Sequence, residues 1–525
     1  MPAPRARRRV AINTAIFSVA TGLSRIMGLI REVVASRYFG TSGPASAFTL
    51  AFQVPNLVRS LFADAAISAA FVPVFTELLE RDEKKEAFRL ASTLFWVILA
   101  VLGAITALFI LGAGVIMPLF TGDFGPGLVH LTVGLSRVLF PIVVLLGLNG
   151  LTVGILNAYD HFSIPALAPL VWNLVIIVGL VTLRSQWSGD RQIYAYAVAV
   201  LAGTVVQFAM AVPLLGRYGF RLRPHVDWRD PRVRQVLRLM LPVTIGLGVI
   251  NFDLVINSSL GSLVSDQAPR AIDAAFRIYM LPQGMFSVAL ATVLFPALSR
   301  YAARGDLDGL GRTMANGVRQ IALLLLPAAA ATVALATPIV RLVYERGAFT
   351  AGSTEQVSLA LFWFSFSLPF AGINLLMTRT FFSLQSPWIP TGLAAGNLVV
   401  NATVSLALYR PFGIAGLVIG TAAASAGMTA GQGLLLHRRL GTTEPRATAR
   451  AVALMVFAAT AFGVVAWGTW RGLDDALGHA LIAQLVSVGL ALTAGALVYV
   501  GLVLLMGIRE ADQIRFLLTS RLKRR

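Results

Sequence analysis

The sequence predicts an all-α, polytopic membrane protein, and three features of its 525 residues support this fold class. Charged residues make up only 13% of the chain and hydrophobic residues 57%, whereas soluble domains contain about 25% charged residues. Apolar runs of about 20 residues, the length that crosses a bilayer as a helix, recur along the whole chain. The loops between them alternate between arginine-rich and arginine-poor, as in proteins that cross a membrane repeatedly.

The apolar runs number fourteen, and each is long enough to form one membrane-spanning helix. Charges within the first two make these the weakest spans by hydropathy. The runs fall near residues 11–38, 45–79, 90–119, 129–157, 164–184, 192–215, 233–262, 270–300, 313–343, 356–383, 389–409, 412–437, 450–470 and 480–507.

The loop charges predict the orientation. Basic residues gather at the N-terminus, in every second loop and in the tail at 521–525, with seven arginines in segment 217–238 alone. The intervening loops carry few, although 184–191 is an exception with two arginines. The positive-inside rule then places both termini in the cytoplasm, which requires an even number of spans. Topology therefore accounts for most of the net charge of +19, and we expect no nucleic-acid partner. The first apolar run reads as a retained helix rather than a cleaved signal peptide.

Residue types exclude several kinds of chemistry. The chain has no cysteine and only five histidines, so thiol catalysis, disulfides and a histidine-rich metal centre are not expected. It contains no phosphate-binding P-loop, no G-x-S-x-G and no H-E-x-x-H motif. We therefore expect no catalytic residues and no enzymatic activity.

A weak internal repeat predicts two homologous six-helix halves in the same orientation. Four pairs of residues recur at nearly equal spacing: Pro73 and Pro296, Pro141 and Pro369, Pro165 and Pro390, and Asn173 and Asn397. Parallel repeats of this kind are typical of transporters, with the substrate site between the halves. The expected parts are a basic N-terminus (1–10), an N-lobe (11–220), a C-lobe (221–440), two further helices (441–510) and a basic tail (511–525).

Arginines within the apolar runs are the main candidate functional residues. Arg25 and Arg31 lie in the first run, Arg59 in the second and Arg277 in the eighth. An arginine in mid-membrane costs at least about 2.5–3.5 kcal/mol and is kept where it faces water, a counter-charge or a ligand. Arg59 and Arg277 each have a proline nearby and belong to equivalent helices of the two halves, so both can face one cleft.

Several guanidinium groups in one cleft would attract an anion, because their paired N–H groups match phosphate oxygens. A pyrophosphate fits this set better than a neutral drug or a cation. Glu32 and Asp64 are expected to hold the arginines when the cleft is empty. The alternative is that the arginines form purely structural salt bridges with these two acids.

A second polar set combines carboxylate, amide and hydroxyl oxygens. Asp253 lies in the seventh run, Asn397 and Asn401 are one helical turn apart in the eleventh, and Thr421 lies in the twelfth. Such oxygens suit Na⁺ or a proton relay. Hydrogen bonds between helices explain the same residues equally well.

Long stretches of the sequence resemble the MurJ/MviN family of lipid II flippases. The resemblance runs from about residue 11 to 440 and is strongest in SRIMGLIREVVASRYFG and AFTLAFQVPNLVRSLFADAAISAAFVPVFTE, residues 24–40 and 47–77. Later blocks are ILNAYDHFSIPALAP, LPQGMFSVALATVLFPALS and YERGAFT, at 155–169, 281–299 and 344–350.

The resemblance implies a fold of the MOP exporter superfamily, with fourteen helices, two lobes around a central cavity and alternating access. It implies an inner-membrane protein that carries lipid II, the undecaprenyl-pyrophosphate-linked peptidoglycan precursor, amid membrane lipids and in contact with other cell-wall synthesis proteins. Residues 441–510 would form a groove for the lipid tail. The implied substrate-binding set is Arg25, Arg31, Arg59, Arg277, Glu32, Asp64 and Asn56, the last within the Arg59 motif; Asp253, Asn397, Asn401 and Thr421 resemble a Na⁺ site.

Three positions depart from the family pattern. Ser46 and Phe276 stand where the family often has aspartate, and Met280 stands at a commonly acidic or polar position. A charge-balancing role for acids at these positions is therefore in doubt in this chain. The alternative function is that of another MOP-superfamily exporter, either an O-antigen flippase or a multidrug/cation antiporter; a cation exporter should have acids where this chain has arginines.

Overall fold

The structure is a computed structural model that describes residues 4–62, 65–159, 161–224, 226–227, 229–440 and 443–510. Side chains are described over the same ranges except 4–18, 59–62, 65–69, 241–243 and 245–251. Within these ranges the chain forms α-helices joined by short loops, without a β-strand. The predicted all-α fold class is confirmed.

The chain divides into two compact units. Unit 1 comprises residues 1–270 and 346–348, and unit 2 comprises residues 271–345 and 349–525. Unit 1 contains α1 (Pro4–Phe39), α2 (Gly43–Phe62), α3 (Ala65–Glu80), α4 (Lys84–Ile116), α5 (Pro126–Leu139), α6 (Ile142–Ala158), α7 (Ser163–Leu183), α8 (Tyr194–Arg217) and α9 (Pro231–Gly261), with short 3₁₀ turns at Met117–Phe120, Arg184–Gln186 and Gly189–Ile193.

Unit 2 continues from α10 (Ala268–Pro282), whose first residues still belong to unit 1. Its remaining elements are a π-helical turn η4 (Gln283–Ser287), α11 (Val288–Ala303), α12 (Leu307–Ala334), α13 (Ala336–Tyr344), α14 (Ala351–Ser383), α15 (Trp388–Phe412), α16 (Ile414–Leu440), α17 (Pro445–Leu477) and α18 (Leu481–Leu505).

Each predicted apolar run coincides with one helix or with one interrupted helix. The second run comprises α2 and α3, with residues 63–64 outside the described ranges. The fourth run is divided into α5 and α6 at Pro141, the eighth into α10, η4 and α11, and the ninth into α12 and α13. Pro141 has no N–H to continue the backbone hydrogen bonds of the helix, which explains the break there. By length and composition, eleven of the described helical segments are apolar enough to cross a membrane. The full count of fourteen spans stays a prediction.

Apolar side chains on the outside of the helices support a lipid environment. Leu111 on α4 is 81% exposed, and Ile482 and Leu505 on α18 are 76% and 84% exposed. Apolar side chains this exposed are unfavourable in water and are expected where helices face lipid or a partner.

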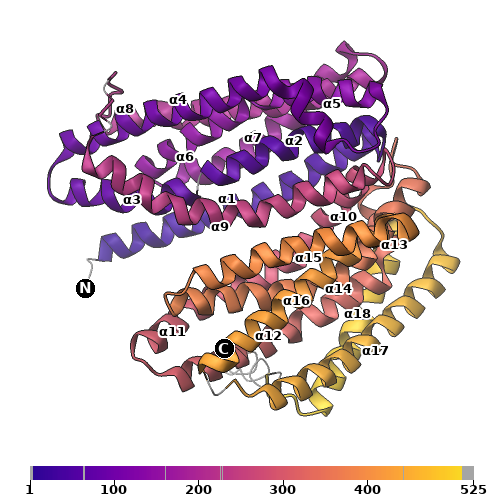
Figure 1. Ribbon diagram of the computed structural model, residues 1–525. Helices are drawn as coiled ribbons and strands as arrows, with labels where there is room; N and C mark the ends of the chain where they lie inside the picture. The colour runs from indigo at the N-terminus through magenta and orange to yellow at the C-terminus, as the bar shows by residue number, and fades with distance from the viewer. Residues whose placement is uncertain are drawn as a thin grey trace. The chain divides into compact units, whose positions relative to one another are not determined.

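Different helix pairs form the cores of the two units. In unit 1, α1 packs against α7, α2 against α5 and α9, and α6 against α3, α4 and α8. In unit 2, α15 packs on α16, α14 on α12 and α16, and α17 on both α18 and α12 (Figure 1). The residues of the repeat fall on helices of matching order, with Asn173 and its neighbouring prolines on α7 and Asn397 on α15.

Gly420 determines how closely α15 and α16 approach. A Cβ atom at this position would lie 2.2 Å from the Ser405 hydroxyl oxygen and 2.9 Å from the Asn401 side-chain oxygen. The single O–H of Ser405 has two acceptors within reach, Asn401 Oδ1 and the Leu417 carbonyl, each at 3.1 Å, so neither side chain can easily move aside.

Gly420→Ala is therefore expected to lower the melting temperature of the purified protein, since overpacking typically costs about 1–3 kcal/mol. Gly427→Ala, seven residues further along α16, is the matched control because no atom would lie within 4 Å of its Cβ. Equal melting temperatures for the two variants would contradict this account of the helix contact.

Candidate functional site

The candidate site in unit 1 is built on the polar face of α1. Arg31 and Glu32 are adjacent, and Ser36 follows Glu32 by one helical turn on the same face. Glu32 is 2% exposed and Ser36 is fully buried. A carboxylate buried this deeply needs a counter-charge and hydrogen-bond donors to remain ionised.

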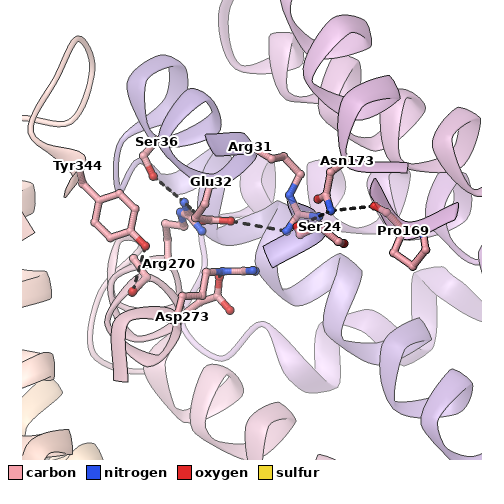
Figure 2. A network of polar contacts seen from close by, with 11 residues as sticks. Ser24, Arg31, Glu32, Ser36, Pro169, Asn173, Arg270, Asp273 and Tyr344 are labelled. Atoms are coloured by element: carbon pink, nitrogen blue, oxygen red, sulfur yellow. Dashed lines mark hydrogen bonds and ion pairs between the residues drawn. The ribbon is translucent and has the colours of Figure 1, made fainter. Parts of the chain in front are cut away.

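Arg270, in the first turn of α10, is the closest counter-charge of Glu32. Its Nη2 lies 2.5 Å from Glu32 Oε1 and donates to Ser36 Oγ at 2.9 Å (Figure 2). The backbone N–H of Arg270 also donates to Ser46 Oγ, over 3.2 Å. These contacts tie the start of α10 to α1 and α2, and Arg270 itself is only 6% exposed.

Arg31 has looser contacts than Arg270. Its Nη2 is 3.9 Å from Glu32 Oε2, and its guanidinium carbon lies 4.8 Å from the centre of the Trp172 ring. Its Nε atom is buried and has no hydrogen-bond partner among the described residues. Trp172 is held in place because its indole N–H donates to Thr204 Oγ1 at 3.1 Å. The guanidinium thus rests on an aromatic face, with donor capacity to spare.

A pocket of about 360 Å³ lies beside Arg31 within unit 1. Its volume falls within the range of about 300–1,000 Å³ that small-molecule sites usually have. The polar groups of its wall are Arg31, Asn56, Gln207 and the Trp172 indole, and Pro55 and Pro169 contribute apolar surface. The pocket therefore brings together two predicted site residues, Arg31 and Asn56.

Asn173 fastens α7 to α1 beside this pocket. Its side-chain amide donates to the Pro169 carbonyl at 2.9 Å and to the Ser24 carbonyl at 3.4 Å (Figure 2). The amide thus bonds one carbonyl of its own helix and one of α1.

In unit 2, Arg277 is paired with an acid on its own helix. Its Nε lies 2.9 Å from Asp273 Oδ2, one helical turn earlier, and the arginine side chain is 35% exposed. Asp273 supplies a carboxylate although Phe276 stands at the position that is often acidic in the family. Phe276 instead packs near Tyr279 and Phe364, with ring centres 5.6 and 5.9 Å away. Charge balance at Arg277 is thus retained.

The other two positions that depart from the family pattern, Ser46 and Met280, differ in their surroundings. Ser46 is fully buried and accepts the Arg270 N–H, while Met280 is 44% exposed. Of the remaining predicted residues, Arg25 is exposed on α1. Asp64 lies outside the described residues, as does the side chain of Arg59. The predicted meeting of Arg59 and Arg277 in one cleft stays a prediction.

The four residues of the predicted cation site fall in both units. In unit 1, Asn257 Nδ2 donates to Asp253 Oδ2 at 3.5 Å on α9. In unit 2, Asn401 is fully buried and accepts from Ser405, whereas the buried Oδ1 of Asn397 has no partner among the described residues. Thr421 lies on α16, next to Gly420. The Na⁺ assignment stays a prediction.

Sequence reasoning missed Arg270 and Asp273. Together with Arg277 they are spaced at three and four residues along α10, so all three lie on one helix face. That polar stripe, in a helix otherwise rich in alanine and apolar residues, was the available signal. The family pattern places an acid at position 276, and Asp273 lies one helical turn before that position.

Comparisons with known proteins agree with this architecture. The family model described as "Lipid II flippase MurJ" matches residues 35–486. A probable lipid II flippase MurJ of Vibrio cholerae is 28% identical over 526 residues, covering 96% of this chain and 98% of that protein. Another of Rhizobium meliloti is 33% identical over 411 residues, covering 76% and 75%.

Solved structures show the same fold. A structure described as lipid II flippase MurJ in an inward closed conformation aligns with a TM-score of 0.77 at 23% identity, over 95% of this chain and all of that one. An inward-facing multidrug-resistance MATE transporter of the MOP superfamily aligns with a TM-score of 0.70 at 14% identity, over 80% and 95%. With its family match spanning most of its length, its helical spans and its MurJ-like fold, this chain is a multi-pass membrane protein that belongs to the MurJ lipid II flippase family.

Proposed function

We propose that this protein translocates lipid II from the cytoplasmic to the outer leaflet of the inner membrane by alternating access, with both termini in the cytoplasm. The observation that carries the proposal is Arg31, a cation on the wall of a pocket in unit 1. Its Nε lacks a hydrogen-bond partner among the described residues. Lipid II carries a pyrophosphate, and guanidinium groups bind phosphate oxygens through paired, charge-assisted hydrogen bonds.

The unequal distances around Glu32 support Arg31 as the cation that meets the substrate. Glu32 lies 2.5 Å from Arg270 and 3.9 Å from Arg31. Arg31 can turn toward a pyrophosphate while Glu32 remains compensated by Arg270. Release is favoured for the same reason, because the carboxylate stays within reach and competes for the guanidinium once the cargo can leave.

Arg277 is proposed to contact the same cargo. Its pairing with Asp273 is intrahelical, and the two side chains are 35% and 14% exposed, so the arginine is reached more easily than the acid. A doubly charged ligand offers the guanidinium a stronger partner than the single carboxylate and can displace it. The proposal also includes an energy source for the return of the empty protein to its starting conformation. That source is coupling to Na⁺ or H⁺ or to the membrane potential, since one charge moved across 100 mV is worth about 2.3 kcal/mol.

Arg277→Ala is expected to abolish translocation in cells depleted of their own flippase, with the precursor left on the cytoplasmic face. Arg277→Lys should retain only partial activity, because an ammonium group cannot form the paired contact. The measurement is the accessibility of labelled precursor to an externally added hydrolase, with the amount of protein in the membrane checked by immunoblot.

Arg300→Ala serves as the matched control. Arg300 lies on α11, in the same interrupted helix as Arg277, but is exposed near its end. Full translocation by Arg277→Ala, or an equal loss in Arg300→Ala, would overturn the role assigned to Arg277.

A further inference from the structure

Unit 2 contains a second polar cavity, far along the sequence from the arginines of the candidate site. It has a volume of about 770 Å³ and lies where the end of α12, α13, the start of α14 and the end of α17 meet. The neighbouring segments 345–352 and 471–479, the second of which is helical as far as Leu477, are poor in positive charge, so the positive-inside rule predicts that they lie outside the cytoplasm.

The cavity carries charges of both signs. Its permanent cation is Arg341, its carboxylates are Glu345 and Glu355, and His479, which lies 3.3 Å from Asp474, also lines it. Arg341 uses only Nη1 to reach Asp474, at 3.4 Å from each carboxylate oxygen. Charge-assisted hydrogen bonds are usually about 2.7–2.9 Å long, so this pairing is loose and most of the five guanidinium N–H groups keep their capacity.

A buried hydroxyl also points to a ligand. Ser358 lines the cavity and is 6% exposed, yet its Oγ has no hydrogen-bond partner among the described residues. Leaving a buried hydroxyl unpaired is costly, about 1–3 kcal/mol, so a polar guest that pairs with it would be favoured. Glu355, one turn earlier on α14, is exposed and available to the same guest.

The two carboxylates and one arginine favour a zwitterion over a simple ion. A plain anion on Arg341 would face Glu345 and Glu355, and a plain cation would face Arg341. A molecule with a phosphate and an ammonium group can satisfy both signs at once.

An apolar groove continues from this cavity. The groove measures about 740 Å³ and shares Val333, Ala334 and Trp467 with the cavity wall. It follows α12 over 322–334 and α17 over 452–467. At 1.5 Å rise per residue this is about 20 Å. One leaflet of a hydrocarbon core of about 30 Å is somewhat shorter, so the groove can hold a full acyl chain.

Two tryptophans mark the junction of cavity and groove. Trp467 lines both, and Trp470 lines the cavity. Tryptophan is enriched where the hydrocarbon core meets the head-group layer. The cavity therefore lies at head-group depth and the groove at acyl-chain depth.

We propose that this cavity binds the head group of a zwitterionic phospholipid, with the phosphate on Arg341, the ammonium on Glu355 and an acyl chain in the groove. The head-group cavity contains none of the arginines proposed to contact lipid II. Its groove follows α17, within residues 441–510, where the family resemblance implies a groove for the lipid II tail.

Native mass spectrometry of the purified, delipidated full-length protein tests the proposal. The probes are phosphatidylethanolamine and phosphatidylglycerol with identical acyl chains. We expect a phosphatidylethanolamine adduct that Glu355→Gln weakens about tenfold or more, because the ammonium group exchanges an ionised acceptor for a neutral amide oxygen. Arg341→Gln should weaken the adduct as well. If Arg341→Gln does not fold, the result for Glu355→Gln decides the test.

Asp475→Asn is the matched control. Asp475 is 69% exposed at the same end of the unit and pairs with Arg471, but it does not line the cavity. The proposal is overturned if wild type forms no adduct, if phosphatidylglycerol binds equally well, or if Glu355→Gln and Asp475→Asn behave alike.

Discussion

Glu32→Leu is expected to abolish transport and to lower the free energy of unfolding by about 3–5 kcal/mol, the usual cost of removing one partner of a buried ion pair. Glu32 compensates Arg270 at 2.5 Å and Arg31 at 3.9 Å, and it is 2% exposed. Its loss leaves two guanidinium groups without their shared carboxylate. Thermal unfolding in detergent and the precursor-accessibility assay would measure the two effects.

The double variant Glu32→Leu, Arg270→Met tests whether the instability comes from leaving Arg270 without its carboxylate. Because an apolar replacement of a whole buried pair is often neutral or stabilising, the double variant should regain much of the lost stability. Glu77→Leu is the control, since Glu77 pairs with Arg81 at 2.6 Å but is 55% exposed. A double variant as unstable as Glu32→Leu would show that the Glu32–Arg270 pair does not determine the packing of α1 with the start of α10.

Arg319→Met is expected to be similarly destabilising in unit 2, by about 3–5 kcal/mol. Arg319 on α12 is 7% exposed and bonds through Nε to Glu510, which is 2% exposed. Its Nη1 also reaches Glu444 at 3.0 Å and Thr448 at 3.2 Å. One guanidinium thus fastens the start of α17 and the segment after α18 to α12. Melting temperature and the rate of tryptic cleavage would report its loss.

Arg471→Met provides the comparison for this prediction. Arg471 is 60% exposed, and its pair with Asp475 at 3.8 Å is solvent-accessible, so its loss should change stability little. If Arg319→Met melts at the same temperature as Arg471→Met, then apolar packing among α12, α17 and α18 holds these helices together without the ionic contact.

The sequence predicted much of the fold because membrane helices leave a strong signal. With lipid as solvent, each span needs a long apolar stretch, and these stretches predicted where the helices lie but not the breaks within them, such as the one at Pro141. α1 and α2 were harder, because arginines and other polar residues on them lower the mean hydropathy. Those same residues include the candidate site.

The pairing of the site residues was less predictable. Glu32 lies closer to Arg270 than to Arg31 because of where α10 starts relative to α1. This is a long-range contact that no local sequence pattern specifies. The substitution of Asp273 for an acid at position 276 could have been found from helical spacing alone. The Arg319 network joins three segments that are distant in sequence, and each of its acids resembles an ordinary loop charge.

The π-helical turn between α10 and α11 has a consequence for sequence alignment. A π turn accommodates one residue more than an α-helical turn without rotating the helix that follows it. Across Gln283–Ser287, therefore, a homologue can lack one residue and still direct the side chains of α10 and α11 as here. A one-residue gap placed elsewhere in this pair would turn every later side chain by about 100°. Alignments of distant relatives should place any length difference within this turn.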